Sequence, residues 1–320
     1  MATGSAKKRS LALDGGLATE IERMGYNLQG DPLWSARFLA DNPSVIRDVH
    51  KSYVLCGSDV IITASYQASI PGFCEHLKIS PNESESLIKL SVKLAHQAIE
   101  ESNLSEERSR PIEIEGIGLR RLPLVAGSVG PYGACLHDGS EYTGTYVNSV
   151  TKEMLQAWHR PRIKALLEAG VDLLACETLP AQLEARAILE LLRNDFPHAR
   201  CWITFSCKDE LCLCHGEKLS DAVSSLIDFP QAIGFGINCT APIYVKSLLD
   251  EIRPLVEKKG KTLVVYPNSG EKWTKEGWQS AESIVSLEAL VPSWISSGAE
   301  WIGGCCRTEP KDIRIIKTLL

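Results

Sequence analysis

The sequence predicts a single α/β domain with the (β/α)8 fold, the TIM barrel. Short apolar runs recur along the whole chain, segments with helical periodicity lie between them, and no linker rich in Pro, Gly or Ser divides the 320 residues. Strand–helix alternation sustained through eight units indicates a closed parallel barrel rather than an open sheet. We therefore expect an N-terminal tail over residues 1–9 and one barrel domain over residues 10–320.

The predicted strands are nearly continuous apolar runs, which is typical of strands buried on both faces of a parallel sheet. A small or polar residue follows each run. The first three units are longer than the later ones, so we expect extra loop material after the first three strands. The predicted strands are Ser10–Asp14, Asp59–Ala64, Leu122–Gly127, Asp172–Cys176, Cys201–Phe205, Ala232–Ile237, Thr262–Tyr266 and Glu300–Gly303.

The segments between the strands carry apolar residues at helical spacing. The clearest begins at Ser80, with Pro81 at the first helical position and Glu83 placed to complete a capping box. Pro161 falls inside another helical segment, and we expect it to kink or split that helix. Segment 102–121 is polar and then irregular, which indicates a surface excursion. The other predicted helices lie at 44–56, 151–169, 181–194, 242–259, 282–297 and 309–319.

Composition narrows the class of protein. The formal net charge of -6 argues against binding to nucleic acid or to a membrane surface. No apolar run approaches the roughly 20 residues of a membrane span, and the first ten residues lack the apolar stretch of a signal peptide. The eleven cysteines are spread along a long chain, which favours reduced thiols over a disulfide framework. We expect a soluble cytoplasmic protein.

Three cysteines follow the ends of predicted strands, where barrels of this kind collect their functional residues. Cys239 comes after the sixth strand, and Cys305 and Cys306 follow paired glycines after the eighth. Three thiolates leave the fourth position of a tetrahedral zinc open, as a catalytic zinc requires. Each cysteine alone is more simply an ordinary buried thiol. Three together at the mouth of one barrel predict a catalytic zinc.

A second group of possible ligands lies within one loop. Cys207, Cys212, Cys214 and His215 follow the fifth predicted strand. A structural zinc is one interpretation of this group, but the repeated Cys-x-x-Cys knuckle of such sites is missing. Ordinary loop cysteines are the interpretation we favour.

Carboxylates stand at two other strand ends. Asp14 and Glu177 follow different strands, and two acidic groups at one barrel mouth suit the ammonium group of an amino-acid substrate. Solvated or helix-capping carboxylates are the alternative. Thr63 and Tyr66 offer hydrogen-bond donors at the second strand, although Thr is equally a packing residue there. Asn238 is a weaker candidate, because Asn at a strand end often only makes a turn.

Short motifs along essentially the whole chain point to one known family. The most specific are Asn238-Cys239 and Gly303-Gly304-Cys305-Cys306-Arg307. The other motifs are Asp14-Gly15-Gly16-Leu17-Ala18-Thr19-Glu20, Asp31-Pro32-Leu33-Trp34-Ser35, Thr63-Ala64-Ser65-Tyr66-Gln67, Gly127-Ser128-Val129-Gly130-Pro131-Tyr132-Gly133, Asp138-Gly139-Ser140-Glu141-Tyr142, Glu177-Thr178 and Tyr266-Pro267-Asn268-Ser269-Gly270-Glu271. With these motifs the chain resembles the homocysteine S-methyltransferase family, and in particular its S-methylmethionine-dependent branch.

The resemblance implies one Zn2+ per chain, held by Cys239, Cys305 and Cys306, with the sulfur of homocysteine as the fourth ligand. It implies methyl transfer from S-methylmethionine, with S-adenosylmethionine as a second possible donor, to give methionine. Betaine-dependent relatives carry a long C-terminal extension used in oligomerisation, whereas this chain ends 14 residues after Cys306. We therefore expect a sulfonium donor, small-molecule substrates only, and a monomer or weak oligomer.

The resemblance also implies a homocysteine pocket. Asp14 and Glu177 belong to it, with Glu177 on the ammonium group, while Thr63 and the backbone around Gly15 orient the amino acid. The sulfonium would lie against aromatic faces, for which Tyr66, Tyr132 and Tyr142 are the candidates.

Two other functions remain open at this point. A selenol such as selenocysteine is an alternative methyl acceptor at the same zinc. A barrel that only stores zinc or senses oxidation is an alternative from another class, although such a protein has no need of the carboxylates or of the Asp138–Tyr142 loop.

Overall fold

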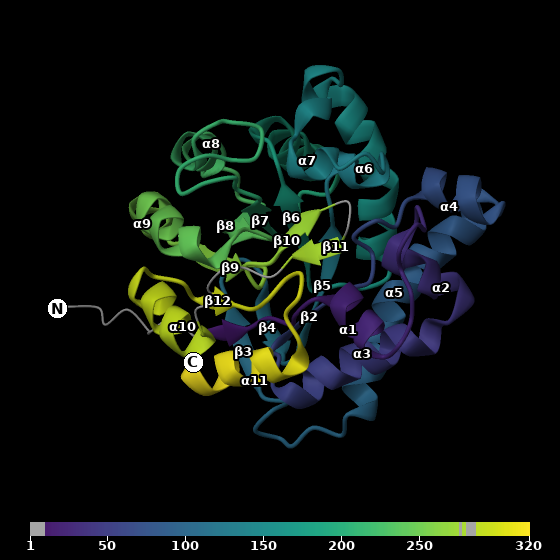
Figure 1. Cartoon of the computed structure of the whole chain (residues 1–320), viewed down its shortest axis with the longest axis horizontal. Helices are drawn as coiled ribbons and strands as arrows, with labels where there is room; N and C mark the ends of the chain where they lie inside the picture. Colours follow the sequence, from purple (N-terminus) through teal and green to yellow (C-terminus); the bar gives the residue numbers. More distant parts are fainter. Residues whose placement is uncertain (1–9, 275–276, 280–285) are drawn as a thin grey trace.

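A closed parallel barrel lies at the centre of the computed structural model, which describes residues 10–274, 277–279 and 286–320, with helices around it (Figure 1). Its strands are β1 (Leu11–Ala12), β2 (Val60–Ile62), β5 (Leu124–Val129), β6 (Leu173–Leu179), β7 (Cys201–Phe205), β8 (Ala232–Asn238), β9 (Thr262–Tyr266) and β12 (Trp301–Ile302). They pair in the order β1-β12-β9-β8-β7-β6-β5-β2. A parallel bridge between Leu13 and Val60 joins the two end strands. The predicted single-domain (β/α)8 fold is confirmed.

The predicted helices are present, with small shifts at their ends. The capping box at Ser80 is formed, and Glu83 accepts from the Ser80 backbone N–H at 2.8 Å. The split predicted at Pro161 does not occur, because one helix runs unbroken through that residue. The predicted residues 282–285 of the tenth helix lie outside the described residues. The helices are α3 (Pro43–Cys56), α5 (Pro81–Glu101), α6 (Lys152–Glu168), α7 (Gln182–Asp195), α9 (Pro242–Lys258), α10 (Leu287–Ser296) and α11 (Pro310–Leu319).

Extra elements follow the first three barrel strands, as expected, and others follow β7 and β9. Short helices that the periodicity did not reveal are α1 (Leu17–Arg23), α2 (Phe38–Asp41), α4 (Ile70–Leu77) and α8 (Leu219–Leu226). The 3-10 turns are η1 (Trp34–Arg37), η2 (Tyr132–Cys135), η3 (Ser140–Tyr142) and η4 (Thr145–Asn148). With eight residues or fewer, each of these helices is too short to show a hydrophobic stripe. A hairpin of β10 (Lys272–Thr274) and β11 (Gly277–Gln279) follows β9.

The apolar core has two layers. Residues that point outward from the strands pack against the helices, and those that point inward fill the barrel. In β7 the two faces alternate: Trp202 belongs to the interior cluster, whereas Cys201 and Ile203 belong to the outer one. Trp202 also contacts Tyr266 and Trp301 edge to face inside the barrel. The interior of the barrel is therefore a packed core.

The segment 102–121 differs from its prediction as an irregular surface excursion. Its second half forms an antiparallel hairpin of β3 (Pro111–Ile114) and β4 (Gly118–Arg121). Ile112 and Ile114 are buried in the interior cluster, while the residues between them face outward. The hairpin packs near Ile233, at the start of β8, and so covers the amino-terminal end of the barrel. The alternation of isoleucine with charged residues was the signal for this hairpin.

Within the part of the chain that the structure describes, no helix combines the length and the apolarity that crossing a bilayer would require. The predicted tail, residues 1–9, lies outside the described residues.

Candidate active site and metal centre

A cavity of about 120 Å³ opens at the carboxyl ends of the barrel strands. Its walls come from the carboxyl ends of β2, β5, β6 and β9 and from the segments that follow β1, β2, β8 and β12. Of the residues that the sequence predicts for the site, all but Asn238 line this cavity: Asp14, Gly15, Thr63, Tyr66, Glu177, Cys239, Cys305 and Cys306. Residues up to 292 positions apart in the sequence are thus brought to one place by closure of the barrel.

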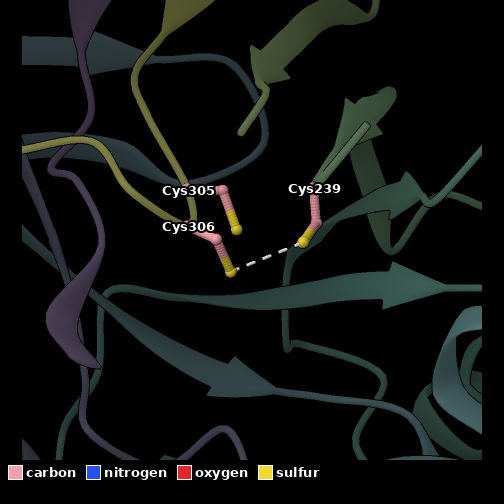
Figure 2. A group of neighbouring side chains, drawn as sticks. All are labelled: Cys239, Cys305 and Cys306. Carbon is pink, nitrogen blue, oxygen red and sulfur yellow. Dashed lines mark hydrogen bonds between the residues drawn. The ribbon is translucent and has the colours of Figure 1, made fainter. Parts of the chain in front are cut away.

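The three cysteines form a compact group at the cavity floor, with their sulfur atoms within 4.8 Å of one another. Figure 2 shows that Cys305 and Cys306 come from one loop and that the Cys306 sulfur points toward the Cys239 sulfur, which lies 3.7 Å away. Cys239 has a left-handed backbone, with φ of 48°. Its N–H donates to the Tyr266 carbonyl at 3.1 Å, which ties this turn to the end of β9.

The loop that carries Cys305 and Cys306 is anchored on both sides. The Cys305 N–H donates to the Pro267 carbonyl at 2.8 Å, and the Thr308 hydroxyl donates back to the Cys305 carbonyl at 2.6 Å. A Cβ on Gly304 would lie 2.1 Å from the Thr308 hydroxyl oxygen, so this turn requires glycine. The loop therefore holds adjacent thiols on the same side as Cys239.

The spacing of the sulfurs suits a tetrahedral metal. Zn–S bonds of about 2.3 Å at tetrahedral angles place two sulfurs about 3.8 Å apart, close to the 3.7 Å between Cys239 and Cys306. Hydrogen bonds from Cys239 and Cys305 lower the pKa of the Cys306 thiol well below its usual value. One thiolate is thus favoured even before a cation arrives, and the residues present fit a metal that prefers sulfur.

Two buried carboxyl groups lie in the wall above the thiols. Asp14 Oδ2 accepts from the Ile62 N–H at 2.8 Å, and the Ser128 hydroxyl donates to Glu177. Burial raises the pKa of Asp14 well above its usual value, and it raises the pKa of Glu177 to about 8. Each carboxyl also raises its neighbour's cost of ionisation, because Glu177 adds to the upward shift of the Asp14 pKa. A bound cation would relieve both charges.

The strand that carries Glu177 is longer than predicted. Glu177 and Thr178 lie inside β6, where the register with β7 shifts between Cys176 and Leu179. Thr178 has φ of 58°, a left-handed conformation. Irregularities of this kind re-aim a side chain, and here Glu177 faces the cavity.

Asn238 is the last residue of β8 and stands behind the wall. Its Oδ1 accepts from the Thr178 N–H at 2.7 Å, and its Nδ2 donates to the Thr178 hydroxyl at 2.7 Å. The same Nδ2 lies 4.0 Å from the Cys305 sulfur. Asn238 therefore holds the irregular strand and one thiol in place, and its predicted contact with substrate stays a prediction.

Thr63 and Gly15 line the cavity, but the hydroxyl group of Thr63 is already engaged in hydrogen bonds within the protein. The Thr63 hydroxyl contacts Ser65 Oγ at 2.7 Å and accepts from the Ser128 N–H at 3.0 Å. A Cβ on Gly15 would lie 2.8 Å from the ring of Tyr53. That phenol donates to the Gly16 carbonyl at 3.1 Å, which fixes the loop after β1.

The aromatic wall only partly matches the three predicted tyrosines. Tyr66 and Tyr142 line the cavity, whereas Tyr132 is not among its lining residues and instead packs edge to face on Trp158, with ring centroids 5.2 Å apart. Trp34 and Tyr266 line it as well and were not singled out. The signals for them were the position of Tyr266 at a strand end and the place of Trp34 in a matching motif.

The second cysteine group does not converge. Among the described residues, Cys239, Cys305 and Cys306 are the only set of three or more potential ligands close enough to hold a metal. Cys207 pairs with Leu213 in an antiparallel bridge. His215 Nδ1 is 3.1 Å from Glu217 instead of facing a thiol. The interpretation of these residues as ordinary loop cysteines is thus supported.

Fold and site together define a (β/α)8-barrel protein with three cysteines close enough to hold a metal ion and two buried carboxyls at its mouth. Comparison with known proteins gives the family. The homocysteine S-methyltransferase family model matches residues 11–320, and the chain belongs to that family.

Relatives of similar length surround it. The chain is 44% identical to the homocysteine S-methyltransferase of Escherichia coli, covering 97% of this chain and 95% of that protein. It is 43% identical to homocysteine S-methyltransferase YbgG of Bacillus subtilis, covering 96% and 93%. The crystal structure of the metallated form of the homocysteine methyltransferase MmuM from E. coli superimposes with a TM-score of 0.83 at 42% identity, covering 98% of this chain and 97% of that one.

One relative changes an expectation. A betaine-homocysteine S-methyltransferase of Drosophila melanogaster is 40% identical, and the match covers 92% of its length as well as 95% of this chain. That relative has no room for a long C-terminal extension. Chain length therefore does not distinguish betaine-dependent from sulfonium-dependent enzymes of this family. Only the residues that line the cavity bear on the identity of the methyl donor.

Proposed function

We propose that the protein transfers a methyl group from a sulfonium donor to the thiol of homocysteine, giving methionine, with one Zn2+ held by Cys239, Cys305 and Cys306. The observation that carries the proposal is the convergence of three sulfurs, within 4.8 Å of one another, in the same cavity as two buried carboxyls. The names of the E. coli and B. subtilis relatives and the metallated form of MmuM support it.

The three cysteine thiols, and the residues that hold them in position, provide the site at which the substrate sulfur is activated. A zinc ion held by Cys239, Cys305 and Cys306 would keep the substrate sulfur deprotonated at neutral pH and still nucleophilic. Around it, the anchored Gly304 turn fixes Cys305 and Cys306, and the Tyr266 carbonyl fixes Cys239. The Asn238 amide near the Cys305 sulfur orients that ligand, as outer partners of metal ligands commonly do.

The carboxyls orient the amino-acid part of homocysteine. Glu177, held by Ser128, and Asp14, held by the Ile62 N–H, offer oxygens to an ammonium group. Burial makes both carboxyls costly to ionise when alone, so an ammonium ion that enters gains strong pairing there. This pairing fixes the amino acid with its thiol toward the three cysteines.

The aromatic wall suits a sulfonium cation. Trp34, Tyr66 and Tyr142 line the cavity, and ring faces attract cations. In the transfer, a lone pair of the homocysteine sulfur forms the new S–C bond to the methyl carbon, and the pair of the breaking S–C bond returns to the donor sulfur. Charge is neutralised on both partners, so positioning and exclusion of water are what the protein must supply. S-methylmethionine and S-adenosylmethionine are the donors that fit this chemistry.

The test is an assay of methionine formation from homocysteine with S-methylmethionine, S-adenosylmethionine or betaine, alongside the zinc content. Cys305→Ala is expected to lose both zinc and turnover, whereas Cys56→Ala, at a half-buried thiol of α3, should keep both. Full activity without zinc would refute the mechanism.

Two further outcomes address the alternatives. Zinc binding without turnover on any thiol or selenol would favour a storage or sensing barrel. Faster methylation of selenocysteine than of homocysteine would make the selenol the acceptor.

A further inference from the structure

A second cavity adjoins the first on the side away from the barrel axis. Its volume is about 380 Å³, and it lies between the segment 22–34 and the turns η2 and η3. The two cavities share three wall residues, Trp34, Gln67 and Tyr142. The smaller cavity, whose wall holds the thiols, has a volume of about 120 Å³. Because the two cavities share these wall residues, a donor whose methyl group reaches the thiols can extend into the larger cavity.

Glu141 is the unusual group in the wall of this second cavity. Glu141 is among the residues that line the cavity, although it is only 8% exposed. Its Oε2 is buried and has no hydrogen-bond partner among the described residues. A buried carboxylate oxygen without a partner is costly, and such groups are rare unless a ligand completes them.

The backbone around Glu141 is held in place. Asp138 Oδ1 accepts from the Ser140 N–H at 2.9 Å at the start of η3. A Cβ on Gly133 would lie 2.8 Å from the Glu141 nitrogen, so η2 and η3 pack backbone against backbone. The carboxylate is therefore presented from a fixed turn.

The charges around the cavity favour a cation. Glu22, Asp31 and Glu141 line it, and no Lys or Arg stands among its described lining residues. Asp31 is already paired with Arg37, which leaves Glu141 as the buried carboxylate without a counter-ion. Burial lowers the pKa of His137, the remaining basic residue of the wall, so it is neutral at pH 7.

We propose that Glu141 binds the α-ammonium group of the methyl donor, which makes the second cavity the donor's amino-acid subsite. The proposal rests on the methyl transfer proposed above and narrows its donor to amino acids that carry a sulfonium. An unpaired carboxylate oxygen needs an N–H donor, which an ammonium group supplies. The sulfonium itself and the quaternary nitrogen of betaine have none. Glu141 thus selects an amino-acid sulfonium over both betaine and sulfoniums without an amino group.

The experiment compares S-methylmethionine with its des-amino analogue, 4-(dimethylsulfonio)butanoate, as methyl donors for homocysteine. For Glu141→Gln we expect kcat/KM to fall about 30-fold or more with S-methylmethionine, as for loss of one partner of a buried charge pair. The rate with the des-amino donor and the KM for homocysteine should stay unchanged. Glu113→Gln, at an exposed position of β3, is the matched control and should change neither rate. An equal fall with both donors, or no fall, would overturn the proposal.

Direct binding separates this inference from the proposed function. Calorimetric titration of S-methylmethionine into the wild-type protein, Glu141→Gln and Glu113→Gln should show weaker binding only for Glu141→Gln. If no donor methylates homocysteine, the proposed function fails and the titration alone decides whether the subsite exists. If Glu141→Gln does not fold, Glu141→Asp replaces it in both assays, with a smaller loss confined to S-methylmethionine. Equal binding by the wild-type protein and the variant would refute the subsite.

Discussion

Two groups of cysteines in this chain both look like possible metal ligands in the sequence, but they are arranged differently in the structure. Cys207, Cys212 and Cys214 lie within one loop, whereas the barrel elements α9, β9, α10 and β12 separate Cys239 from Cys305 and Cys306. The distant group converges within 4.8 Å, and the neighbouring one does not.

The difference has a local cause. In the loop, Cys207 forms a bridge with Leu213, so these two side chains share one face of a ribbon while the residues on either side of Leu213 take the other. Backbone hydrogen bonds fix this arrangement, such as that from the Lys208 N–H to the Cys212 carbonyl at 3.1 Å. At the barrel mouth, left-handed and glycine-supported turns point all three thiols inward. Strand ends that meet in space make a better ligand set than closeness in sequence.

Removal of one thiol from each group gives the largest expected contrast. Cys239→Ala should abolish zinc binding and lower kcat/KM by about a thousandfold or more, because several kcal/mol of metal-ion catalysis disappear. Cys212→Ala should change neither property. Metal analysis of the purified variants and the methionine assay measure both. Loss of zinc from the Cys212→Ala protein would mean that the loop group binds metal after all.

A substitution of Asn238 tests whether its hydrogen bonds are needed to hold the three cysteine sulfurs together. Asn238→Ala removes the clamp on Thr178 and the N–H near the Cys305 sulfur. We expect zinc affinity to fall about 10- to 100-fold, the usual effect of losing an outer partner of a ligand. Competition with a chelator measures the affinity. Asn27→Ala, which removes only an exposed turn contact to the Gln29 N–H, is the control. An unchanged affinity in Asn238→Ala would show that the turns alone hold the thiols.

Prediction from the sequence succeeded where one pattern dominates. Continuous apolar runs located all eight barrel strands, because strands buried on both faces carry an unbroken signal. The cysteines at strand ends could be placed together from barrel topology alone. The places of Asp14 and Glu177 at strand ends suggested an ammonium-binding role, and the resemblance to the family identified homocysteine as the amino acid.

Other features could not be predicted from the sequence because they depend on tertiary structure. Glu177 lies inside a strand at a register shift that no local pattern announces. The hairpin of β3 and β4 was hidden in a polar segment, since only two isoleucines reach the core. Glu141 belongs to the Asp138–Tyr142 motif, but the sequence does not show that its Oε2 atom has no hydrogen-bond partner among the described residues. That follows only from the packing of the turns η2 and η3.

The protonation of the thiols gives the finest test of the comparison. Cys306 and Cys214 are both half-buried thiols. Hydrogen bonds from Cys239 and Cys305 lower the pKa of Cys306, whereas burial raises the pKa of Cys214. A lowered pKa moves ionisation of the thiol to lower pH, and a raised pKa means that the thiol stays protonated until the pH exceeds its higher value. In metal-free protein, alkylation of Cys306 by iodoacetamide should therefore rise less steeply from pH 7 to 9 than alkylation of Cys214. Alkylation of Cys214 should rise by about tenfold per pH unit. Mass spectrometry of the modified peptides gives both rates in one sample, and equal pH slopes would show that convergence does not activate the thiols.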